Sequence, residues 1–216
     1  MDDLLGIVAL SLRIAAIATV LSLVIGLPLG TVLALSTFRG KKVILSVINT
    51  GMAVPPVVAG LVIALLLWRS GPLGFLNLIY TPSAIVIAEV VIATPVILGL
   101  TAAGIEALDP RLRLQLQGLG ASRRQMVWWL WREAKLSLLA AMMAGFGRVI
   151  SEVGAAMMVG GNIAGQTRVL TTAIVLSVGR GEFAAGLALG ALLLAIAFVV
   201  NTVLTAAQRS GKQVVT

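Results

Sequence analysis

Five long apolar stretches dominate the hydrophobic pattern of the chain. A helix that crosses the roughly 30 Å hydrocarbon layer of a bilayer needs about 20 mostly apolar residues. Five stretches meet this requirement, at residues 4–36, 43–68, 81–103, 136–160 and 184–207. We therefore expect an all-α integral membrane protein with about five transmembrane helices, forming a single domain over residues 1–216. The first stretch is long enough for a kink, and Gly26-Leu27-Pro28-Leu29-Gly30 provides a place for it.

Basic residues are concentrated on one side of these predicted spans. Loops in the cytoplasm carry an excess of Lys and Arg, and Trp68, Tyr80 and the tryptophans at 128–131 fall near span borders, where aromatic belts lie. The bias predicts a multi-pass protein of the cell (inner) membrane with its N-terminus outside and its C-terminus in the cytoplasm. Eleven of the sixteen Lys and Arg residues lie on the cytoplasmic side in this arrangement: Arg39, Lys41, Lys42, Arg111, Arg113, Arg123, Arg124, Arg132, Lys135, Arg209 and Lys212.

The composition agrees with a membrane location and excludes several kinds of chemistry. Hydrophobic residues make up 59% of the chain and charged residues 11%, whereas soluble domains contain about 25% charged residues. The formal net charge of +8 is assigned to loops, so no nucleic-acid partner is expected. The sequence has neither Cys nor His, which removes the usual thiolate, imidazole and metal-ligand groups. We expect no catalytic residue, metal or cofactor.

The link at about residues 106–135 is long and predicts a helix, a glycine turn and a second helix. Asp109-Pro110 is a favourable helix start, and Ser122 with Gln125 forms a capping-box pattern. Residues 111–117 alternate polar and apolar, a period typical of a strand. A helix is favoured because an isolated strand would leave its backbone groups unpaired. The link either only connects two spans or docks a soluble partner.

The fourth span contains two charged residues in an apolar setting. Arg148 and Glu152 are four residues apart, so in one continuous helix they would share a face and could pair. Intramembrane charges are functional candidates by default, although a salt bridge that only fixes packing is an equal alternative. Arg13 and Glu89 are further intramembrane charges, which could pair with each other or lie near span ends.

Two features follow these charges along the chain. Gly160-Gly161-Asn162 is predicted to end the fourth span, and its exposed backbone groups could line a pathway. Between residues 167 and 178, Leu170, Ile174 and Val178 recur every four residues. This segment is too short to span, so a surface helix on the outer side is expected.

The link at residues 106–135 resembles the EAA loop of the membrane subunits of binding-protein-dependent ABC importers. Its turn matches the family pattern, whereas residues 114–116 replace Glu-Ala-Ala and Arg132-Glu133 replaces Leu-Pro. In that family the loop is a cytoplasmic coupling loop that sits in a groove on the ATPase subunit. The resemblance implies these ATPase-coupling residues: Leu114, Gln115, Leu116, Leu119, Gly120, Ala121 and Ser122.

The segment from residue 147 onward is similar to the oxyanion branch of these importers. The positions that match that branch are Glu152, Gly154, Ala155, Gly161, Asn162, Ile163 and Gly165, and residues 157–163 and 167–174 are most similar to tungstate permeases. The resemblance implies a type I ABC importer permease fold, a homodimer in membrane lipid, and two copies of an ATP-binding cassette subunit. It also implies an extracytoplasmic substrate-binding protein that delivers tungstate. The candidate pathway or gate residues are Arg148, Glu152, Gly160, Gly161 and Asn162.

The energy source and the cargo leave alternatives open. The sequence has no Gly-x-x-x-x-Gly-Lys-Ser/Thr phosphate loop, so we expect a transport subunit that is not itself an enzyme, with ATP hydrolysed by a partner. A molybdate or sulfate permease is the alternative within this class, because tetrahedral oxyanions differ little in charge and shape. A secondary transporter driven by an ion gradient is the alternative outside it, since such proteins have broken midplane helices. A scaffold without transport activity is a further one.

Overall fold

The computed structural model describes the backbone of residues 4–210 and the side chains of residues 4–206, and over this range every regular element is helical. Arg209 and Lys212 lie outside the described side chains. The helices are α1 Leu4–Leu35, α2 Lys41–Ala53, α3 Pro56–Leu67, the short 3-10 helix η1 Gly74–Leu76, α4 Pro82–Glu106, α5 Pro110–Gly118, α6 Arg123–Glu133, α7 Lys135–Ile150, α8 Gly154–Gly160, α9 Leu170–Gly179 and α10 Phe183–Ser210.

By length and apolar character, these helices supply the predicted number of membrane spans. α1, α4 and α10 are each long enough to cross a bilayer. α2 with α3, and α7 with α8, reach the same length only as bent pairs, at angles of 97° and 55°. Counting each pair as one span gives five within the described residues. The prediction of about five spans is confirmed in number, but two of them are broken.

The first span is continuous and packs closely on α4. Small residues let two helix backbones approach each other, and Cβ atoms added to Gly26 and Gly30 would lie 2.8 and 2.6 Å from atoms of α4. α1 continues through Pro28 as one helix of 32 residues. The segment at residues 26–30 therefore serves as a contact with α4 and does not divide the span.

The second span is broken where two prolines follow each other. A residue before proline is restricted to extended conformations, and Val54 has φ −58° and ψ 127°, with Pro55 also extended. Pro56 then begins α3, at a position where its missing N–H costs no hydrogen bond. The local backbone preferences of these residues explain why one apolar stretch forms two helices.

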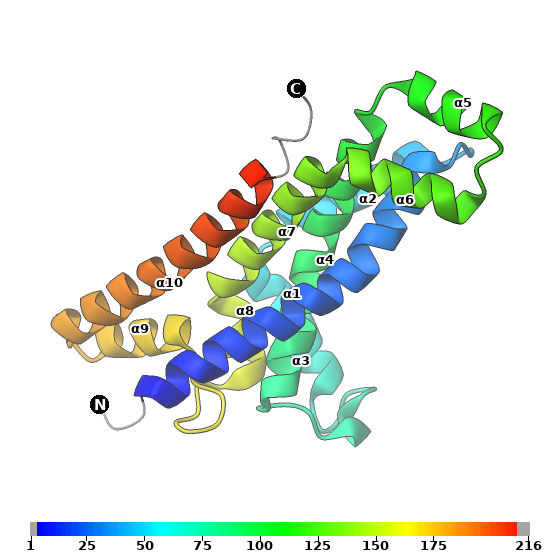
Figure 1. Ribbon diagram of the computed structural model, residues 1–216. Coiled ribbons are helices and arrows are strands. Elements are labelled where there is room, and N and C mark those ends of the chain that lie inside the picture. Colours follow the sequence, from blue (N-terminus) through cyan, green and yellow to red (C-terminus); the bar gives the residue numbers. More distant parts are fainter. Residues whose placement is uncertain (1–3, 211–216) are drawn as a thin grey trace.

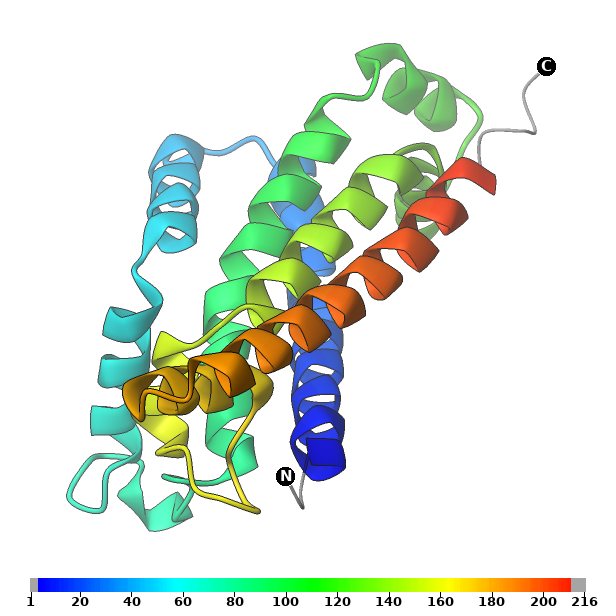
Figure 2. The same ribbon diagram turned by 90° about the vertical axis from the view of Figure 1, so that its left-hand side faces the viewer.

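Two buried apolar clusters hold the spans together. The first joins α1, α3, α4 and α8, and the second joins α1, α4 and α7. α10 adds only partly buried residues to the second cluster, among them Leu193 and Val200. Figure 1 shows α5 and α6 at one end of the bundle and α9 at the other. Figure 2 shows α10 lying obliquely in front of α7.

Candidate functional site

The link at residues 106–135 forms a helical hairpin, α5–α6, with the caps expected from its sequence. The Asp109 carboxylate accepts a hydrogen bond from the Arg111 N–H at 2.8 Å, and Pro110 is the first residue of α5. Ser122 and Gln125 form the complete capping box at the start of α6. The helical interpretation of residues 111–117 is confirmed, and the strand suggested by their alternation is not formed.

The predicted coupling residues occupy different surfaces of this hairpin. Leu116 is buried, and its carbonyl oxygen accepts a hydrogen bond from the Ala121 N–H at 3.0 Å, which closes the turn. Gly120 has φ +73°, a backbone conformation in which a residue with a side chain would be strained. Gln115 and Ser122 are exposed, and Leu114 and Leu119 are 65% and 83% exposed. Two bare leucines on a polar hairpin indicate a surface that a partner can cover.

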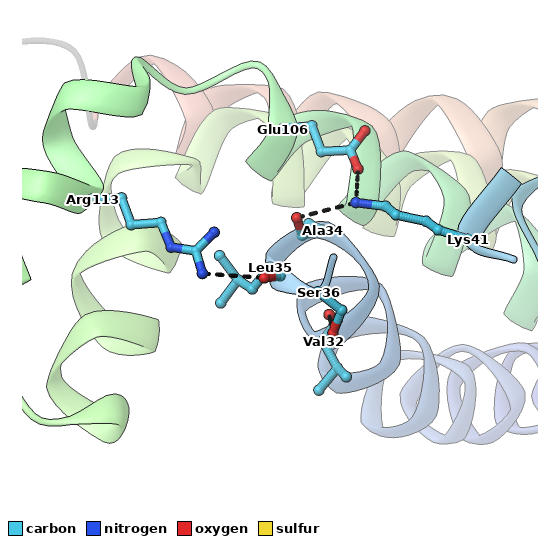
Figure 3. Close-up of polar contacts among 7 residues, drawn as sticks. All are labelled: Val32, Ala34, Leu35, Ser36, Lys41, Glu106 and Arg113. Carbon is cyan, nitrogen blue, oxygen red and sulfur yellow. Dashed lines mark hydrogen bonds and ion pairs between the residues drawn. The ribbon is translucent and has the colours of Figure 1, made fainter. Parts of the chain in front are cut away.

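The hairpin is attached to the bundle by polar contacts that the sequence does not reveal. Arg113 of α5 donates a hydrogen bond from Nη2 to the Leu35 carbonyl oxygen at 3.1 Å (Figure 3). Trp131 of α6 donates from Nε1 to Thr31 Oγ1 at 2.8 Å. Both acceptors lie near the C-terminal end of α1. One of them, the Leu35 carbonyl oxygen, is a backbone atom that every residue has, so the sequence does not indicate this contact.

Arg148 and Glu152 do not pair, because the helix that was expected to place them on one face ends between them. α7 ends at Ile150, and residues 151–153 separate it from α8. Arg148 instead directs Nη2 toward the Val54 carbonyl oxygen at 3.5 Å, and the Glu152 carboxylate accepts a hydrogen bond from the Ala155 N–H at 3.0 Å. The spacing of four residues is meaningful only in a continuous helix, so the break makes the pairing prediction wrong.

The breaks in the two bent spans lie close together. Arg148, beside the second break, reaches the carbonyl of Val54 in the first. A Cβ atom on Gly60 of α3 would lie 2.5 Å from the Ala155 Cα atom of α8. One on Gly154 would lie 2.4 Å from the Val57 side chain. Irregular backbone at membrane depth persists only inside protein or beside water. Here the glycine contacts pack α3 against α8 beside the breaks, while Pro55 and Ser151 in the breaks are exposed in the single chain.

Two buried carboxyl groups line a small cavity beside the second break. Glu89 is 4% exposed and Glu152 is 6% exposed, and both border a cavity of about 10 Å³ together with Ser11 and Thr171. This volume is close to the space that one water molecule requires. Among the described side chains, Arg13 is exposed on α1 and forms no ion pair with Glu89.

The turn at Gly160, Gly161 and Asn162 ends α8 as expected, and most of its polar groups are engaged. Gly161 and Asn162 both have positive φ values. The Gly160 carbonyl oxygen accepts a hydrogen bond from Thr167 Oγ1, and Asn162 donates to the Thr172 carbonyl oxygen. Arg168 donates to both oxygens of Asn162 at 3.3 Å. In this conformation the turn is a largely exposed connection to α9, held by hydrogen bonds.

The short helix α9 is present but does not lie only on the surface. Leu170, the first of its three spaced apolar residues, is 1% exposed, whereas Val178 is 45% exposed. The Leu170 N–H donates to Ser11 Oγ of α1, and Thr171 Oγ1 donates to the Glu152 carbonyl oxygen, each at 2.8 Å. One end of α9 is therefore inserted between α1 and the α7–α8 break.

The comparison with known proteins identifies the family. Residues 26–210 match the family model described as binding-protein-dependent transport system inner membrane component. The chain belongs to this family. The tungstate uptake system permease protein TupB of Peptoclostridium acidaminophilum is 40% identical over 94% of this chain and 89% of its own length. A probable anion ABC transporter permease protein of Haloferax volcanii is 39% identical over 92% of this chain and 88% of its own length.

The fold of this permease agrees with a solved member of the type I class. A structure of the MetNI methionine ABC transporter in inward-facing conformations covers 99% of this chain and 98% of its own, with a TM-score of 0.78 and 19% identity. At this identity the likeness concerns the fold alone. The expected all-α fold of a type I ABC importer permease is confirmed.

Proposed function

We propose that this chain is the transmembrane subunit of an ABC importer that moves tungstate, or a similar tetrahedral oxyanion, into the cell. The observation that supports this most directly is the 40% identity to a tungstate uptake permease over nearly the whole chain. The 39% identity to a probable anion permease supports the same class of cargo.

The energy for transport would come from an ATP-binding cassette subunit that covers the α5–α6 hairpin. This role is supported by the exposed Leu114 and Leu119, on a hairpin otherwise rich in polar residues. An apolar contact of this kind is a common source of binding energy in protein interfaces. Residues 114–116 and 119–122 are the proposed coupling residues, and an ATPase that binds them would sit in the cytoplasm.

The remaining assembly follows from this placement. With the hairpin in the cytoplasm, the N-terminus lies outside and the C-terminus inside, in the cell (inner) membrane. Two copies of the chain would line one pathway, because a two-fold dimer is the economical way to build a channel from five spans per chain. Two ATPase subunits would bind at one face and an extracytoplasmic binding protein at the other.

The pathway would pass the two helix breaks, where Arg148 and Glu152 lie. Arg148 Nε is buried without a hydrogen-bond partner, so this cation is the group best suited to a passing anion. Glu152 repels an anion and is assigned to holding the break, and Gly160, Gly161 and Asn162 to the outer gate. A weak site is sufficient because a transit path must release its cargo.

The test is ATP turnover by the complex reconstituted in proteoliposomes. Binding protein loaded with tungstate, molybdate or sulfate is added in turn, and we expect the largest stimulation with tungstate. Stimulation by molybdate or sulfate alone would replace tungstate by the alternative cargo. Uphill uptake under an ion gradient without the ATPase subunit would reject the proposal in favour of a secondary transporter.

A further inference from the structure

The C-terminal end of α1 is held by side chains from three other segments of the chain. The last carbonyl groups of a helix lack partners inside the helix and carry partial negative charge, so they attract cations. Arg113 of α5 donates to the Leu35 carbonyl oxygen at 3.1 Å, and Lys41 of α2 donates to the Ala34 carbonyl oxygen at 3.4 Å (Figure 3). Lys41 also forms an ion pair with Glu106, the last residue of α4, at 2.8 Å.

A further contact reaches the same end of α1 from the second helix of the hairpin. Trp131 donates from its indole Nε1 to Thr31 Oγ1 at 2.8 Å. Thr31 and Leu35 are four residues apart and so belong to the same side of α1, one turn from each other. Both helices of the hairpin therefore hold the last two turns of α1, one through a side-chain hydroxyl and one through a backbone carbonyl.

These contacts create a connection that the covalent chain does not provide. The hairpin follows α4 directly, through residues 107–109, and precedes α7. It is joined to α1 only across space, at a sequence separation of 78 residues for Arg113 and 100 for Trp131. α1 in turn packs along α4 through Gly26 and Gly30, where Cβ atoms would collide with α4. A displacement of its last turn must therefore affect that packing.

We propose that Arg113 and Trp131 form a grip on the last two turns of α1, through which movement of the α5–α6 hairpin is passed to α1. Lys41 and Glu106 extend the same contact to the start of α2 and the end of α4. Arg113 and Trp131 are positioning residues for transport, and this role rests on the proposed docking of an ATPase on the hairpin. Without the grip, the hairpin would pull only on α4 and α7, to which the chain connects it.

The first test removes each half of the grip in the complete reconstituted complex. Arg113→Gln removes the cationic donor, and Trp131→Phe removes the indole N–H while keeping an aromatic ring. We expect each to reduce the stimulation of ATP turnover by loaded binding protein about tenfold, within the usual range of coupling between sites. The basal ATP turnover and the amount of bound ATPase subunit should stay within about twofold, because the exposed leucines are unchanged.

Matched controls lie beside both residues. Arg111→Gln makes the same change of charge on α5 at an exposed position, and Trp129→Phe makes the same ring change on α6. Both should retain full stimulation. Arg113→Lys should recover part of it, because lysine can still donate to a carbonyl group. If Arg113→Gln and Trp131→Phe are stimulated as strongly as their controls, the grip is rejected.

A covalent replacement of the contact tests the inference from the opposite direction. The natural chain has no cysteine, and Leu35 and Arg113 line the same cavity of about 440 Å³. In the double variant Leu35→Cys, Arg113→Cys, stimulation should be low, and a short thiol-bridging reagent should restore at least half of it. Efficient bridging without any recovery would overturn the proposal.

The grip and the proposed transport function would be rejected by different results. Strong stimulation of the wild-type complex together with unimpaired Arg113→Gln and Trp131→Phe rejects the grip and leaves the proposed function intact. A wild-type complex in which no ATPase subunit binds, or in which loaded binding protein has no effect, rejects the proposed function and the grip with it.

Discussion

The α5–α6 hairpin and the α7–α8 break are both organised by capping side chains, but in different surroundings. At the hairpin, Ser122 caps α6 at the end of an exposed turn. The same turn begins with Leu119, whose side chain is also exposed. At the break, the buried Glu152 binds the Ala155 N–H, and glycines bring α3 and α8 into close contact. When an exposed cap is removed, bulk water can bind the freed N–H, whereas the buried N–H of Ala155 has no access to bulk water.

This difference indicates what each region is built to do. The hairpin keeps its own fold with few buried residues and leaves apolar side chains uncovered, as a surface for a partner does. The break uses dense packing and internal hydrogen bonds to keep irregular backbone among apolar helices. Substitutions should therefore damage association at the hairpin and stability at the break.

The largest expected effect is at the glycine contact beside the break. Gly60→Val would place side-chain atoms against the Ala155 backbone, where even a Cβ atom would lie at 2.5 Å. Overpacking of this kind lowers the free energy of unfolding by about 3 kcal/mol. Thermal unfolding in detergent measures this loss. Gly147→Val on α7 is the control, since a Cβ atom there has open space, and it should stay within about 1 kcal/mol of wild type. Equal losses in both variants would contradict the packing argument.

A smaller effect, on binding alone, is expected at the hairpin turn. Leu119→Asp replaces an 83% exposed leucine by a charge and should weaken association with the ATPase subunit by about 2 kcal/mol, roughly 30-fold. The thermal stability of the isolated permease should be unchanged. Phe75→Asp, at a position 74% exposed on the short helix η1 outside the hairpin, should leave the association unaffected. Co-purification at graded ATPase concentrations measures both variants.

The next largest effect is expected when the buried cap at Glu152 is removed. Glu152→Ala leaves the Ala155 N–H without its acceptor inside the bundle, which costs about 1–2 kcal/mol of the free energy of unfolding. Glu152→Gln keeps an amide oxygen in the same place and should retain most of the stability. Thermal unfolding of the two variants in the same detergent distinguishes them. An alanine variant as stable as the glutamine variant would show that the cap does not hold the break.

The smallest effect is expected when the exposed cap is removed. Ser122→Ala deletes the acceptor for the Gln125 N–H, at a cost of about 1 kcal/mol that is confined to α6. Amide hydrogen exchange should rise about fivefold at residues 123–126, while the bundle melts at the wild-type temperature. A fall in the melting temperature as large as that of Glu152→Ala would remove the distinction between the two regions.

Much of the fold follows from the sequence because membrane spans depend on length and apolar character. The hairpin was also predictable, since Asp109-Pro110 and the Ser122–Gln125 pair are local cap signals that need no tertiary information. The bend at Val54-Pro55-Pro56 has a local cause as well. It was missed because the surrounding residues form one uninterrupted apolar stretch, and hydropathy alone does not distinguish a continuous span from a bent pair.

The site was less predictable, because its contacts depend on which backbone atoms come together. Arg148 and Glu152 were correctly placed in one apolar segment, but their relation assumed that α7 continued beyond Ile150. Arg113 was noted only as one of several loop cations, since its partner is a carbonyl group 78 residues away. Residue types carry no signal for such acceptors. The pathway and coupling roles of the predicted residues stay predictions.

The sparse contacts of α10 bear on how the protein is made. Only 6% of the most apolar part of this helix is buried, against 50% for α4. The earlier helices can therefore complete their mutual packing before α10 has emerged from the ribosome, and its arrival changes their interior little. A late span with so much uncommitted surface can exchange lipid neighbours for protein ones after insertion, and such an exchange would leave the packing among the earlier helices unchanged.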